Sequence, residues 1–199
     1  MRIATLILTL LIAIQIQATQ WTVAIVGSPR DPRVSAVREA VAHWNSELTA
    51  LGTTLRLGPV KLVDGPRVDE EVLCGISDGT LAHRWFRRDV NLQAYGADIV
   101  VLLSDSDLIS VSFPPYRDQP GMVILREAAD APLSWPNVAR NVAAHELGHA
   151  LGLSHNQDVS MLMCGRPAPC RPNAFRSDDL HWFPLNDEDK AYLRRRYTD

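Results

Sequence analysis

Residues 145–155 read HELGHALGLSH, a stretch in which three histidines stand at fixed spacings inside an apolar run. Residues four apart share one face of an α-helix, so His145 and His149 project together. Gly152 comes where such a helix must end, because glycine readily adopts φ > 0. The turn brings His155 back toward the first two histidines. The spacing therefore predicts a helix, a turn and a cluster of three imidazoles.

Three imidazole nitrogens are the donor set of a catalytic zinc, with a fourth position open to water. We predict that His145, His149 and His155 bind one zinc ion. A structural zinc is the weaker alternative, because a closed site needs a fourth protein ligand. Glu146 is turned about 100° from His145 and leans over the ion. It is the candidate catalytic residue, a general base and then general acid for hydrolysis of a peptide bond.

The rest of the chain alternates strand-like and helix-like segments. Short β-branched or apolar runs predict strands at 21–27, 53–63, 97–103 and 121–125. Apolar residues at three- and four-residue steps predict a long helix that begins at Pro32, after an Asp31 cap, and ends before Gly52. A second helix is expected at 134–151 with Ser134 as its cap, and a third at 186–197. Residues 64–96 and 104–120 read as irregular.

Composition excludes several classes of protein. The 199 residues are 46% hydrophobic and 22% charged, as in an ordinary globular domain. A net charge of −3 gives no reason to expect a nucleic-acid partner or an anionic membrane. We expect a monomer that acts on a peptide or protein substrate.

The first 18 residues, MRIATLILTLLIAIQIQA, combine one early arginine with an apolar core and a small-residue end. This pattern is typical of a signal peptide cleaved after Ala18. We therefore expect a leader at 1–18, a single domain at 19–199, and export to the extracellular space or periplasm. An uncleaved membrane anchor is the alternative, although the apolar run is short for a span.

The three cysteines leave one residue unpaired in any disulfide scheme. Cys164 and Cys170 bracket a short loop, and a disulfide between them is the simplest reading in an exported protein. Cys74 would then be a free thiol. Pairing of Cys74 with either of the others remains the alternative.

The stretch HELGHALGLSHN, with the SMLMCG segment after it, resembles the metzincin metalloproteases and their HExxHxxGxxH signature. Met163 lies eight residues after His155, as the methionine turn does in the matrixin branch, so the resemblance makes Met163 the floor beneath the histidines. It implies an α+β fold with a twisted, mixed five-stranded sheet, one antiparallel edge strand, an active-site helix and a C-terminal helix. Gly121–Leu125 is our candidate for that edge, where an extended substrate would add as a strand.

The chain departs from the matrixin pattern at several positions. Asn156 follows the third histidine where matrixins usually have serine, and Gly165 stands where other metzincins place a tyrosine ligand. The paired histidines of a second, structural zinc are missing, so we expect a single zinc. The Cys74–Asp78 segment has the look of the matrixins' inhibitory cysteine motif but falls inside the domain. Calcium at Asp105 and Asp107 is a minor alternative, since paired loop acids are usually only solvated.

Two other functions remain open at this stage. The chain could be a dedicated processing peptidase for one partner, which a digestion assay with a general protein substrate would separate from a broad endopeptidase. It could also be a zinc-containing module that binds a protein without catalysis. Glu146 argues against the second, because binding alone does not require a carboxylate that is no ligand.

Overall fold

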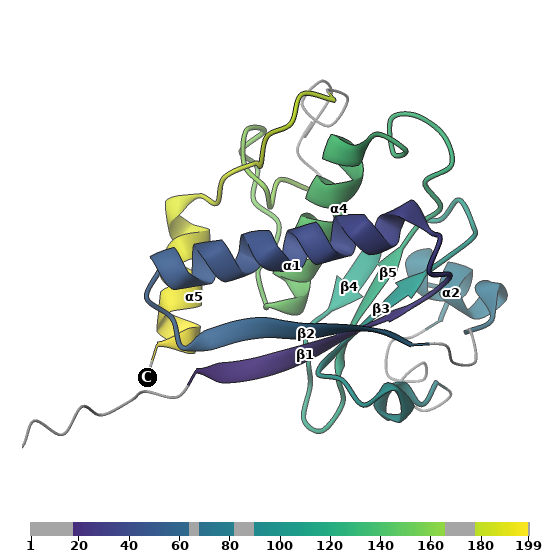
Figure 1. Ribbon diagram of the computed structural model, residues 1–199, viewed down its shortest axis with the longest axis horizontal. Coiled ribbons are helices and arrows are strands. Elements are labelled where there is room, and N and C mark those ends of the chain that lie inside the picture. Colours follow the sequence, from purple (N-terminus) through teal and green to yellow (C-terminus); the bar gives the residue numbers. More distant parts are fainter. Residues whose placement is uncertain (1–17, 64–67, 82–89, 166–177, 199) are drawn as a thin grey trace, which may run out of the picture.

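The computed structural model describes residues 18–63, 68–81, 90–165 and 178–198. Its elements follow one another along the chain with α-helices set between strands (Figure 1). They are β1 (Thr19–Val26), α1 (Pro32–Ala50), β2 (Leu55–Val63), α2 (Glu70–Ser77), the 3₁₀-helix η1 (Leu92–Tyr95), β3 (Ile99–Leu103), β4 (Val111–Phe113), β5 (Gly121–Leu125), α4 (Pro136–Ala150) and α5 (Asp187–Tyr197).

The five strands form one mixed sheet in the order β2-β1-β3-β5-β4. All neighbours are parallel except β4, which pairs antiparallel with β5 at the edge. The predicted sheet with a single antiparallel edge strand is therefore confirmed.

The assignment of Gly121–Leu125 as that edge is wrong. β5 lies inside the sheet between β3 and β4, parallel to β3, and every one of its residues is buried. The true edge is β4, within the segment read as a loop. It escaped notice because it has only three half-buried residues, directly before Pro114 and Pro115.

Both faces of the sheet are covered, which explains the continuous apolar runs of β3 and β5. Odd-numbered residues of these strands, such as Val101 and Val123, pack with α1, α4 and α5. Even-numbered residues, such as Val100 and Met122, pack with α2 and η1. The sheet thus separates two apolar clusters, and residues of the histidine helix α4 belong to the larger one. Helices α1 and α4 lie on the same side of the sheet (Figure 1).

The helix boundaries follow from their caps. The Asp31 carboxylate accepts a hydrogen bond from the N–H of Arg33 at 2.9 Å, and the Asn186 side chain accepts one from the N–H of Asp189 at 2.8 Å. The prediction of Ser134 as cap of α4 is wrong: Trp135 is the N-cap, and Pro136 takes the first helical position. Helix α2, which lies in the segment read as irregular, was not predicted.

Candidate active site

The three predicted histidines come together at the end of α4. One ring nitrogen from each of His145, His149 and His155 lies within 4.8 Å of the others, the one such group of possible metal ligands in the described part of the chain. Gly152, at φ +93°, makes the turn between the helix and His155. The helix, the turn and the cluster expected from HELGHALGLSH are all present.

Backbone carbonyls fix the orientation of two of these rings. Nδ1 of His145 lies 2.7 Å from the carbonyl oxygen of Leu162, and Nδ1 of His149 lies 2.8 Å from that of Leu153. A carbonyl only accepts, so each Nδ1 carries the proton and donates it. The lone pair of each ring is then on Nε2, which is the form that binds a metal.

The donor set fits zinc. Nε2 of His145 and Nε2 of His155 lie 3.3 Å apart. A tetrahedral ion with Zn–N bonds of about 2.0–2.1 Å separates two of its nitrogen ligands by about 3.3–3.4 Å. The spacing of these two nitrogens therefore fits two ligands of one zinc ion.

Glu146 lies beside this cluster and is 5% exposed. Its Oε2 accepts a hydrogen bond of 2.8 Å from the hydroxyl of Ser112, in the edge strand β4. A carboxylate so near the imidazoles suits a proton-transfer role, because it faces the histidine cleft and is held by a donor from another element.

The cluster opens into a cleft of about 400 Å³. Its walls are the end of α2, the segment through β4, and α4 with the third histidine. Ser77 joins two of these walls: its hydroxyl donates to the carbonyl of Ile109 at 2.7 Å and accepts from the N–H of Ile109 at 2.8 Å. Helix α2 therefore supports the edge strand, although it was absent from the sequence prediction.

Met163 is fully buried against α4 at Gly148, and its role as the floor beneath the three histidines stays a prediction. A Cβ at Gly148 would stand 2.5 Å from the Met163 sulfur, so only glycine fits there without displacement. Asn156 binds the same segment: its N–H donates to the Met163 carbonyl, and its side-chain amide donates to Asp189 of α5 at 3.1 Å. Burial raises the pKa of the Asp189 carboxyl.

Two buried asparagines on α4 escaped sequence analysis. The Asn141 side chain donates to the carbonyl of His181 and accepts from the N–H of Phe183, and Asn137 accepts from the N–H of His181. They fix the chain after residue 177 against the active-site helix. The sequence did carry a signal for them: Asn137 and Asn141 are four residues apart, so they share one face of a helix.

The aromatic pair before α5 acts as an anchor. The Trp182 ring stacks on His43 of α1 with centroids 4.2 Å apart, and the Arg140 guanidinium lies 4.5 Å from the Trp182 ring centroid. Phe183 is buried in the larger apolar cluster. Burial, with a smaller contribution from Arg140, lowers the pKa of His43 to about 4.

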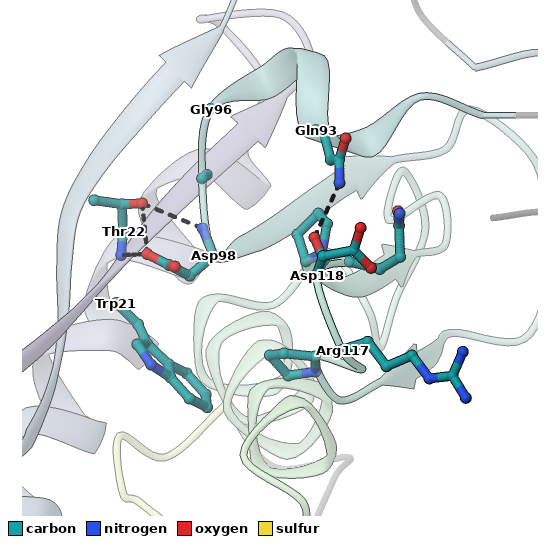
Figure 2. Close-up of a pocket in the computed structure, with 11 residues that line it drawn as sticks. Trp21, Thr22, Gln93, Gly96, Asp98, Arg117 and Asp118 are labelled. Carbon is teal, nitrogen blue, oxygen red and sulfur yellow. Dashed lines mark hydrogen bonds between the residues drawn. The ribbon is translucent and has the colours of Figure 1, made fainter. Parts of the chain in front are cut away.

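A larger cavity of about 520 Å³ lies at the amino ends of β1 and β3, and none of the three histidines lines it (Figure 2). Its polar groups join neighbouring segments: the Asp98 carboxylate accepts from the N–H and the hydroxyl of Thr22, and Gln93 donates to the carbonyl of Asp118. These bonds tie β1 to β3 and η1 to the β4–β5 turn.

The two acids considered for calcium lie close to arginines. Asp107 forms an ion pair with Arg126, and a carboxylate oxygen of Asp105 lies 3.8 Å from the Arg33 guanidinium.

Cys74 is a free thiol within α2, packed against the smaller apolar cluster. Cys170 lies outside the described residues, so its disulfide with Cys164 stays a prediction. Residues 1–17 of the expected leader also lie outside them. Over the part of the chain that is described, no helix has the length and apolar character to cross a bilayer.

The sheet with one antiparallel edge strand and the three-histidine site define a metzincin-like domain. The family model described as matrixin matches residues 76–182, more than half of the chain, and the chain belongs to the matrixin family. It is similar to human neutrophil collagenase, with 41% identity over 78 residues, and spans only 15% of that relative's length. Among solved structures, archaemetzincin from Methanopyrus kandleri superposes with a TM-score of 0.49 at 15% identity, over 93% of this chain and 98% of that one.

Proposed function

We propose that the chain is an exported zinc endopeptidase in which His145, His149 and His155 hold the metal and Glu146 moves the proton. The observation that carries this proposal is the convergence of three imidazoles, two of them held by backbone carbonyls with Nε2 as the acceptor nitrogen. Matrixin membership supports the same assignment. The apolar N-terminal run supports export.

His145, His149 and His155 would hold a zinc ion, which would lower the pKa of a bound water toward neutrality and polarise a substrate carbonyl. Glu146 then accepts a proton from the attacking water and delivers it to the leaving amine, so no bond to the protein forms. Met163, packed beneath α4, supports the helix that carries two of the histidines. The third comes from the turn after Gly152.

The edge strand β4 is the part of the sheet that can receive an extended peptide. The N–H of Gly121 donates to the carbonyl of Asp98, and the carbonyl of Leu125 accepts from the N–H of Ser104. The backbone N–H and C=O groups of the odd-numbered β5 residues therefore point toward β3, and those of Met122 and Ile124 point toward β4. Val111 and Phe113 lie opposite Ile124 and Met122, so their backbone N–H and C=O groups point toward β5 and pair with it.

Ser112 lies between them, and its N–H and C=O point away from the sheet. An added peptide strand would meet these groups beside Glu146, which brings a scissile bond to the site by strand addition. The supporting observations are the register of β4 and the contact of Ser112 with Glu146.

The test is to purify the full chain and measure zinc content and hydrolysis of a quenched peptide library, for the unaltered protein and Glu146→Ala. We expect one zinc per chain in both and a loss of kcat of at least about 10²-fold in the variant. Glu47→Ala, which removes a carboxylate on α1, is the matched control. Zinc content below one, or full activity in Glu146→Ala, would refute the proposal. Parallel digestion of casein separates a broad peptidase from a dedicated processing enzyme.

A further inference from the structure

The hydroxyl of Ser112, in the edge strand β4, donates a hydrogen bond to Oε2 of Glu146 on α4. Ser112 pairs with Val123, whose side chain packs in the cluster that contains α4, so the register of β4 directs the serine side chain to the same face. The donor–acceptor distance of 2.8 Å is that of a good hydrogen bond to a carboxylate.

The neighbouring serine makes a different contact. The hydroxyl of Ser110 accepts a bond of 3.1 Å from the N–H of Arg126 and so joins backbone to side chain. Val111 and Phe113 direct their side chains to the opposite face, where they pack against the cluster of α2. Within β4, the bond to Glu146 is therefore specific to position 112.

We propose that Ser112 is a positioning residue: its hydroxyl fixes the carboxylate of Glu146 while its backbone receives the peptide strand. This inference rests on the proposed function. A carboxylate can rotate about its last side-chain torsion, and that torsion has broad preferences. A hydrogen bond to Oε2 restricts the rotation, so the group that accepts the proton has one orientation relative to a peptide paired at the same residue.

The physical consequence is a coupling between substrate alignment and proton transfer. A shift of β4 moves the peptide partner and the donor to Glu146 together, so their relative geometry is kept. An alanine at position 112 keeps the backbone groups and loses only the hydroxyl. Binding of the peptide should then survive while the proton-transfer step slows.

The first measurement is steady-state kinetics of Ser112→Ala, Ser112→Thr and Ser110→Ala in the full chain, at matched zinc content. We expect Ser112→Ala to lower kcat about tenfold with KM within about twofold of the unaltered protein. Ser112→Thr keeps a hydroxyl and should recover most of kcat. Ser110→Ala should lower kcat much less than Ser112→Ala does. A kcat unchanged in Ser112→Ala, or a loss that Ser112→Thr shares, would overturn the proposal.

A second measurement does not depend on turnover. Urea denaturation midpoints are compared for Ser112→Ala in the unaltered background and in Glu146→Ala, with metal chelated throughout. We expect Ser112→Ala to lower the midpoint only where Glu146 is present, because the two side chains share one bond. Equal shifts in both backgrounds would show that the serine does not hold the carboxylate. If the unaltered chain hydrolyses nothing, the proposed function fails, and this cycle still decides the role of Ser112.

Discussion

Replacing Gly148 by alanine should destabilise the protein, although alanine is the better helix former. In an open helix interior the change is worth about 0.8–1.0 kcal/mol in favour of alanine. In α4 the new Cβ would stand 2.5 Å from the sulfur of Met163 and 3.1 Å from a ring carbon of Trp44. Both of those side chains are fully buried, so neither can move into solvent.

The size of the effect follows from this overlap. Ordinary contact distances are about 3.5–4.0 Å, so the sulfur must move by about 1 Å or more. Overpacking of this kind costs about 1–3 kcal/mol, which exceeds the gain in helix propensity. We expect a net loss of up to about 2 kcal/mol in the free energy of unfolding.

Urea denaturation of Gly148→Ala, Met163→Ala and the double variant measures this loss. The penalty of the alanine should shrink once the sulfur is removed, because the two positions share one contact. Gly75→Ala in α2 is the matched control, since its Cβ meets Leu81, an exposed side chain that can swing away. Should Gly148→Ala prove as stable as the unaltered chain, Met163 does not fill the space beneath the active-site helix.

Two further predictions concern the contacts of α4 with its neighbours. Because the pKa of His43 is lowered to about 4, stability should be full above pH 6.5 and fall as the pH drops from about 6.5 to 4. The full pKa shift of His43 corresponds to about 3 kcal/mol of unfolding free energy, and the partial exposure of the ring reduces this to about 1–2 kcal/mol. His43→Phe keeps a ring against Trp182 and should flatten that part of the curve; the same slope in both proteins, measured by denaturation across pH, would contradict the assignment. Asn141→Ala removes the amide that binds the backbone of 181–183, and thermal unfolding should show a loss of about 2–3 kcal/mol, whereas a loss under about 0.5 kcal/mol would mean that the segment is held elsewhere.

The parts of the fold that the sequence predicts are those with a local signal. The parallel strands β3 and β5 are apolar at every position, and α1 repeats its apolar residues at helical steps between Asp31 and Gly52. Each of these patterns is complete within one segment. The strand β4 has no such signal, because three half-buried residues become a strand only by pairing with β5.

The same division holds in the active site. Spacing alone brings His145 and His149 together, because four residues make about one helical turn. The carbonyls that orient their rings belong to Leu162 and Leu153. Every residue has a backbone carbonyl, so the sequence does not indicate which ones act in this way. Ser112 meets Glu146 across 34 residues of sequence, through a strand whose place in the sheet had to be known first.

The dependence of the site on the chain after α4 follows from these bonds. Leu153 lies one residue after the turn at Gly152, and Leu162 is tied through its N–H to Pro184. The two carbonyls therefore orient the histidines only if both the turn and the contact with the segment before α5 are formed. These bonds come from protein groups, so the orientation of the donor nitrogens depends on how this segment folds. Mutations that disturb residues 152–165 or 178–184 should thus weaken metal binding even where they touch none of the three imidazoles.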